Sequence, residues 1–344
     1  MFRAVGPVFN TWPSRIDRGF DDVQEGPIEE KGNIMKLAKI LSVTTASLAL
    51  VATTACSTTT MDAPQTAAAT SMATLERVPG DGPALWKVSD ADTTIYMFGT
   101  IHLLPKDVQW QNAAITNALA SSDSVVTELM PGAGETPEDQ QMFMTRGMLG
   151  DGRNLREMMS ADQKTRYEAA LAKLGLPPAA FDQFKPWMAT VTLSIMPLIQ
   201  AGYDPTAGVE KVVETMAGPD KQRVALETVE YQLGVFDGMP EETQLRYLMD
   251  TADEIDNIKD QIDSMVAEWV DGDADALAAI MNESLDDPIV AERLLYTRNK
   301  NWAKWIDARL DQPGTVFMAV GAGHLAGEKS VQDYLVQTNV AKRR

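Results

Sequence analysis

One short unit occurs twice in this chain, and it constrains the fold more than any other feature. An apolar run ends in Gly99-Thr100-Ile101-His102-Leu103, and a second one ends in Gly321-Ala322-Gly323-His324-Leu325. Glycine at the end of a strand lets the backbone turn sharply, and the histidine then follows on the loop beyond the carboxyl end. Ligands bind at that edge of an α/β sheet. The repetition therefore predicts neighbouring strands that bring His102 and His324 to one site, rather than two unrelated loop histidines.

Strand-like and helical segments alternate along the chain, which predicts an α/β fold. Apolar or β-branched runs predict strands at 84–88, 93–98, 124–128, 223–226 and 315–320. Helical periodicity is found at 112–121, 137–148, 160–174, 185–201, 208–217, 240–250, 254–270, 273–284, 288–310 and 328–338. We therefore expect a mixed central β-sheet flanked by helices, with a large helical insertion between the two Gly-x-x-His strand units.

The first 83 residues carry export signals rather than the pattern of a fold. A basic start at Met35-Lys36-Leu37-Ala38-Lys39 precedes an apolar run that ends before Cys56. A basic start, an apolar run and small residues are typical of a secretory signal peptide. We predict an over-extended, disordered N-terminus at 1–34, a lipoprotein-type signal peptide at 35–55, a flexible tether at 56–83 and the folded domain at 84–344.

The single cysteine, Cys56, determines the predicted location. Acylation of its thiol would give an exported cell-envelope protein, an outer-membrane lipoprotein that faces the periplasm. Thr53 stands where such signals prefer Leu, so cleavage to a soluble periplasmic form stays open. Contact with the membrane is expected only through the lipid anchor, because the apolar run is short for a bilayer span. A net charge of −19 argues against nucleic acid as a partner.

Two histidines do not complete a metal centre, so carboxylates must supply further ligands. Catalytic metal sites usually take three or more protein ligands. Glu128 and Glu227 each follow a strand-like run directly, as a site residue or a solvated strand end would. We expect a divalent metal held by His102, His324, Glu128 and Glu227, with Glu128 as ligand or general base. This ligand set suits Mn, Fe, Co or Zn.

The helical segment 288–310 carries one further candidate for catalysis, Arg298. Its guanidinium either binds a substrate carboxylate or an oxyanion, or forms a surface ion pair with a neighbour such as Glu292. Trp302 and Trp305 lie three residues apart on one helical face, and we expect them to pack in the core.

Several segments together resemble the TraB/GumN family, which includes the Tiki metalloproteases of animals. They are Leu85-Trp86-Lys87-Val88, Gly99-x-x-His102, Thr127-Glu128, Gly208-Val209-Glu210, Leu226-Glu227-Thr228, Arg298-Asn299 with Trp302, and Val320–Gly327. The resemblance covers about residues 84–340. One departure is Glu210, where the family more often has Asp.

The resemblance implies a fold similar to erythromycin-esterase-like and ChaN-like proteins, and a metal-dependent hydrolase. Tiki proteins cleave peptide bonds with Mn or Co, so a peptide or protein substrate and Mn or Co are implied here, with Zn as a further candidate. By the motif match, His102, His324 and Glu128 would form the essential site. The competing hypothesis is a non-catalytic cell-envelope lipoprotein that binds a metal, a cofactor or a polysaccharide-related partner.

Overall fold

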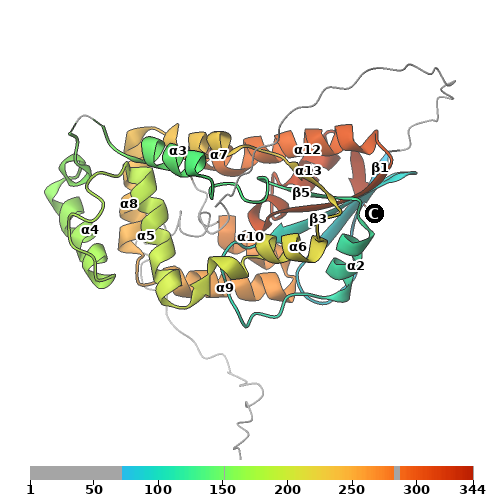
Figure 1. Cartoon of the computed structure of the whole chain (residues 1–344), viewed down its shortest axis with the longest axis horizontal. Helices are drawn as coiled ribbons and strands as arrows, with labels where there is room; N and C mark the ends of the chain where they lie inside the picture. The colour runs from blue at the N-terminus through green and yellow to red at the C-terminus, as the bar shows by residue number, and fades with distance from the viewer. Residues whose placement is uncertain (1–71, 151, 283–286, 344) are drawn as a thin grey trace, which may run out of the picture. The chain divides into compact units, whose positions relative to one another are not determined.

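The computed structural model describes residues 72–150, 152–282 and 287–343 (Figure 1). The predicted N-terminal extension, the predicted signal peptide and Cys56 lie outside these described residues. None of the helices in the described ranges combines the length and the apolar character that crossing a bilayer requires.

A seven-stranded sheet has the strand order β7-β5-β8-β3-β2-β1-β9. Its strands are β1 (Ala73–Arg77), β2 (Leu85–Ser89), β3 (Thr93–Thr100), β5 (Ser124–Thr127), β7 (Gln222–Ala225), β8 (Gly314–Gly321) and β9 (Ala341–Arg343). Strands β7, β5, β8 and β3 run parallel, β2 is antiparallel to β3 and β1, and β1 is parallel to β9. The predicted α/β fold with a mixed sheet is confirmed.

The two strands that precede the histidines, β3 and β8, are neighbours in this sheet. Gly99 pairs with Val320, and Thr100 pairs with Gly321. Both strands are buried on both faces over most of their length, as is usual for parallel strands covered by helices. The two Gly-x-x-His turns therefore leave the sheet from adjacent strands at the same edge.

Helices cover both faces of the sheet (Figure 1). Helices α12 (Thr297–Leu310) and α13 (Val331–Gln337) pack on the face that presents Val88, Ile95 and Met97. The opposite face, with Leu85, Phe98 and Phe317, is covered by α2 (Ala113–Ser121), α6 (Val209–Ala217), α9 (Ile258–Asp271) and α10 (Ala274–Asn282). These two apolar layers fix the sheet edge that carries the histidine turns.

The remaining helices confirm the predicted insertion between the two histidine units. They are α3 (Pro137–Gly147), η1 (Leu155–Met158), α4 (Ala161–Lys173), α5 (Pro186–Gln200), η2 (Pro205–Ala207), α7 (Val229–Asp237), α8 (Glu241–Asp253), α11 (Pro288–Ala291) and the π-helical segment η3 (Glu292–Tyr296). A small second sheet pairs β4 (Leu104–Pro105) with β6 (Tyr203–Asp204), and η4 (Ala322–Leu325) carries His324. Helix α7 was not predicted; the Thr228 side chain caps it by accepting from the Tyr231 N–H.

The predicted tether at 56–83 extends too far, because β1 lies within it. Ala73 and Leu75 are buried, and they alternate with half-buried Thr74 and Glu76. This strand pairs with β2 and also with β9 at the other end of the chain. The short alternation was hidden in a segment rich in small and polar residues, and its partner β9 is too distant in sequence to reveal it.

Candidate functional site

Four parallel strands end at one edge of the sheet, and a predicted site residue follows each of them. These residues are His102 after β3, Glu128 after β5, Glu227 after β7 and His324 after β8. The Glu227 N–H donates to the Glu128 carbonyl at 2.8 Å, which continues the pairing of β5 with β7. The predicted residues thus leave the sheet together, as the rule for the carboxyl ends of parallel strands requires.

The two histidine turns are in van der Waals contact. A Cβ on Gly99 would lie 3.0 Å from Cα of Ala322, so the close approach depends on glycine at this position. The rings are near enough that the charge of His102 contributes to lowering the pKa of His324.

His102 is held by Glu210, which lies in the first turn of α6. Nδ1 of His102 is 2.7 Å from Oε1 of Glu210. Burial lowers the pKa of His102, but the Glu210 carboxylate more than offsets burial and raises the pKa above its ordinary value. Burial in turn raises the pKa of Glu210, and His102 reverses this so that the pKa is lowered. Within the described part of the chain, Nε2 of His102 is buried and has no hydrogen-bond partner.

The beginning of α6 lies directly against the His102 loop. A Cβ on Gly208 would lie 2.3 Å from the carbonyl oxygen of His102, so only glycine allows this approach. The Val209 N–H donates to the Ile101 carbonyl at 3.0 Å. These two backbone contacts bring Glu210 beside the imidazole.

His324 differs from His102, because both of its ring nitrogens face protein groups. Nδ1 lies 2.5 Å from Oδ1 of Asn299, whose Nδ2 donates to the Lys329 carbonyl at 2.8 Å. An amide oxygen can only accept, so Nδ1 carries the hydrogen, and Nε2 accepts from Nη1 of Arg298 at 3.0 Å. Burial, followed by the charge of Arg298, lowers the pKa of His324 well below its ordinary value. His324 is therefore a neutral acceptor for Arg298.

Arg298 is the buried cation of the site, with 3 % of its surface exposed. Its Nε and Nη2 each donate to Glu227 at 2.8 Å, and Nη2 also donates to Glu128 at 2.5 Å. Its Nη1 donates to the Leu294 carbonyl and to His324, both at 3.0 Å. These contacts use all five N–H groups of the guanidinium. Burial lowers the pKa of Arg298, but the two carboxylates raise it overall.

The interpretation of Arg298 as a surface residue paired with Glu292 is wrong. The side chain is buried, and Glu292 accepts from the Thr297 hydroxyl at 2.6 Å instead. Trp302 packs in the core as predicted, and its ring centroid lies 4.2 Å from that of His324. Half-buried Trp305 packs against the same cluster.

Glu128 is also fully occupied by protein donors. Oε1 accepts from the Gly321 N–H at 2.8 Å, and Oε2 accepts from Gln232 at 3.0 Å in addition to Arg298. Burial raises the pKa of Glu128, and Arg298 opposes the rise. Gln232 also donates to Glu227 at 2.9 Å and so bridges the two carboxylates.

Three residues of this network had no predicted role. Glu210 and Asn299 lie in two of the segments that resemble the TraB/GumN family, Gly208-Val209-Glu210 and Arg298-Asn299. That resemblance was a signal from which their place in the site could have been predicted. Gln232 lies on α7, which was itself not predicted, and its sequence context gives no signal.

The residues do not form the predicted metal centre as they are arranged. Within the described ranges, no three His, Cys, Asp or Glu side chains form a group that could hold an ion. The Arg298 guanidinium lies between Glu128, Glu227 and His324, where the ion was expected. His102 Nε2 is the one nitrogen of these two histidines that is free to bind a cation.

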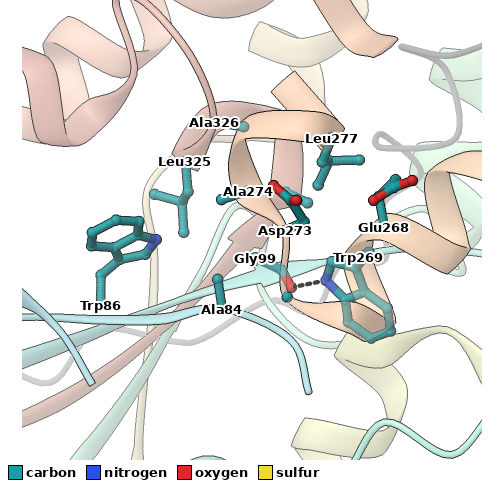
Figure 2. Close-up of a pocket in the computed structure, with 12 residues that line it drawn as sticks. Ala84, Trp86, Gly99, Glu268, Trp269, Asp273, Ala274, Leu277, Leu325 and Ala326 are labelled. Carbon is teal, nitrogen blue, oxygen red and sulfur yellow. Dashed lines mark hydrogen bonds between the residues drawn. The ribbon is translucent and has the colours of Figure 1, made fainter. Parts of the chain in front are cut away.

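A small pocket opens beside the glycine turns (Figure 2). Trp86, Leu277 and Leu325 give it apolar walls, and Glu268 and Asp273 line one side. The Trp269 Nε1–H donates to the Gly99 carbonyl at 2.8 Å and ties α9 to the end of β3. At about 20 Å³ the pocket has room for only one or two water molecules.

Comparison with known proteins gives one match, to a family. A search of curated proteins and a search of solved structures gave no significant match. A sequence model of the TraB/PrgY/gumN family matches residues 84–343, which include every side chain of the network. The chain therefore belongs to the TraB/PrgY/gumN family.

Proposed function

We propose that this protein is an exported hydrolase of the peptidase type, and that His102 activates the attacking water. The observation that carries the proposal is Nε2 of His102, which is buried without a partner among the described residues while Glu210 contacts Nδ1. A neutral imidazole with one free nitrogen can accept a proton from water and so make the water a nucleophile. The resemblance of the Gly-x-x-His units and Thr127-Glu128 to the Tiki peptidases supports hydrolysis of a peptide bond.

Arg298 and Glu128, which the sequence analysis expected to be catalytic, support His102 indirectly in this proposal. Every N–H of Arg298 already donates to a protein acceptor, so none is left for an oxyanion. Both oxygens of Glu128 accept from the protein as well. Their role is to keep the histidine turns in place.

A divalent metal, Mn, Co or Zn, would have to bind in a different arrangement. His102 Nε2 would be its first ligand, and Glu128 and His324 would join only after Arg298 withdrew from them. We therefore assign no step of hydrolysis to an ion. Metal analysis of the purified protein after growth with Mn, Co and Zn tests this; a stoichiometric ion would restore the predicted centre.

The proposal is tested with the full chain and a library of unstructured peptides, with cleavage followed by mass spectrometry. We expect His102→Ala to cut at least about 100-fold more slowly than wild type, because it removes the base. Lys106→Ala is the matched control, since Lys106 is close in sequence but pairs with Asp204 at the surface. Equal rates for wild type and His102→Ala would refute the role of His102.

One observation favours the second candidate, a non-catalytic cell-envelope lipoprotein. The polar side chains of the site already use their hydrogen-bonding groups on protein partners, as in a purely structural network. These side chains are Glu128, Glu227, Arg298 and His324. Absence of cleavage by folded wild-type protein over the whole library would favour this candidate.

We also propose export with a lipid anchor on Cys56, on the pattern of residues 35–56. Labelled fatty acid should be incorporated by the wild type and not by Cys56→Ser. Absence of label in both, with the protein in the periplasmic fraction, would indicate the soluble exported form instead.

A further inference from the structure

We propose that Glu210 is a positioning residue that fixes the tautomer of His102 and leaves its Nε2 lone pair free. The catalytic consequence of this inference rests on the proposed function, but the tautomer itself does not. Nδ1 of His102 lies 2.7 Å from Oε1 of Glu210, a buried oxygen that accepts from no other donor among the described residues. An ionised carboxylate only accepts, so the hydrogen of the neutral ring belongs on Nδ1.

The position of Glu210 is built into the backbone and does not depend on a flexible loop. Helix α6 begins at Val209, whose N–H donates to the Ile101 carbonyl at 3.0 Å. Gly208 allows the His102 carbonyl to approach to a distance that any side chain would prevent. Glu210, in the first turn of α6, is therefore anchored to the same loop that carries its partner imidazole.

His324 provides an internal comparison within the same chain. Asn299 fixes the hydrogen of His324 on Nδ1 as well, but Arg298 then donates to its Nε2. Both histidines thus have the same tautomer, and only His102 keeps an unshared Nε2 among the described residues. This contrast assigns proton transfer to His102 and a supporting role to His324.

The length of the side chain at position 210 can be varied to test this geometry. The carboxylate of Glu210 reaches Nδ1 from one methylene further than an aspartate would. We therefore expect Glu210→Asp to retain the contact after a small shift of the ring. Glu210→Gln keeps the size, but it removes the charge and supplies an amide that can also donate.

Nuclear magnetic resonance of ¹⁵N-histidine-labelled protein reads the tautomer directly. The chain has only two histidines, so the signals missing in His102→Ala identify those of His102. In wild type, treated with chelator and at a pH where the ring is neutral, we expect a protonated Nδ1 and a bare Nε2. In Glu210→Gln the two tautomers of His102 should mix, while Glu214→Gln should change nothing. Glu214 is the matched control on α6, because it pairs with Arg223 instead.

Kinetics supply the second readout. Glu210→Gln should lower kcat about 100-fold with little change in KM, and Glu210→Asp should recover most of the loss. Wild-type kcat in Glu210→Gln, or an Nε2-protonated His102 in the wild-type spectrum, overturns the inference. If the wild type hydrolyses nothing, the proposed function fails while the spectra still decide the tautomer.

Discussion

The two histidines come from similar sequence units but differ in the hydrogen-bond partners of their ring nitrogens. His324 is neutral, its ring is tilted by 44° against that of Trp302, and both of its nitrogens are hydrogen-bonded. His102 has one nitrogen beside Glu210 and one without a partner among the described residues. A group with a free lone pair can react, and a group with none can only support. Similar Gly-x-x-His units thus supply one histidine with an unshared nitrogen and one whose nitrogens are both hydrogen-bonded.

The raised pKa of His102 predicts the pH dependence of the proposed hydrolysis. Only the neutral ring accepts a proton, so the rate should rise with pH through a pKa above 6.5. Glu210→Gln should move this rise to lower pH, because the carboxylate that stabilises the charged ring is gone. The same pair stabilises the folded state below the ordinary pKa of histidine, and that contribution is lost as pH rises through the raised value. A pH–rate profile that Glu210→Gln leaves in place would contradict this.

Removing the buried guanidinium should be costly. We expect Arg298→Met to lower the free energy of unfolding by about 3–5 kcal/mol, because Glu128 and Glu227 then stay buried without a countercharge. Arg343→Met is the control; its pair with Asp333 is exposed and should contribute about 0–1 kcal/mol. Urea unfolding measures both, and a loss below about 1 kcal/mol for Arg298→Met would show that the network does not depend on this charge.

At the scale of helices and strands, close backbone contacts at two glycines bring the site residues together. Helix α6 approaches the His102 loop at Gly208, and η4 approaches the end of β3 at Gly99. The π-helical segment η3 ends just before α12 and supplies the Leu294 carbonyl that accepts from Arg298. Such segments often occur at functional sites.

Adding a methyl group at Gly208 tests whether α6 packs directly against the His102 loop. Gly208→Ala should lower the free energy of unfolding by about 1–3 kcal/mol, since its Cβ would collide with the His102 carbonyl. Gly234→Ala within α7 meets no atom closer than 3.9 Å and should change stability by at most about 1 kcal/mol, in the stabilising direction. Thermal unfolding of both variants provides the comparison, and equal melting temperatures would disprove the close contact.

At the scale of the whole molecule, the sequence predicted the sheet better than the site. Apolar or β-branched runs identified β2, β3, β5, β7 and β8. In β3, β5 and β8 the run is most pronounced, because these parallel strands are buried on both faces. The residues that follow four of these strands meet at one edge, as expected for parallel strands.

Three features could not be read from local pattern, for separate physical reasons. The pairing of β1 with β9 joins the two ends of the described chain, and neither short strand indicates its partner. Arg298 looks like an ordinary helix-surface cation until two strand ends bring Glu128 and Glu227 against it. Helix α7 contains Gly234, which weakens helical propensity, and with that helix Gln232 was missed.

The central claim is that hydrolysis depends on the free nitrogen of His102. Its most direct test is kcat/KM of the chelator-treated full chain, wild type against His102→Gln, on one peptide that the wild type cleaves. We predict turnover by the wild type and a loss of at least about 100-fold in the variant. Turnover that survives His102→Gln would contradict the central claim. Turnover that vanishes on chelation and returns with Mn, Co or Zn would contradict the assignment of His102 as the base and make it a metal ligand.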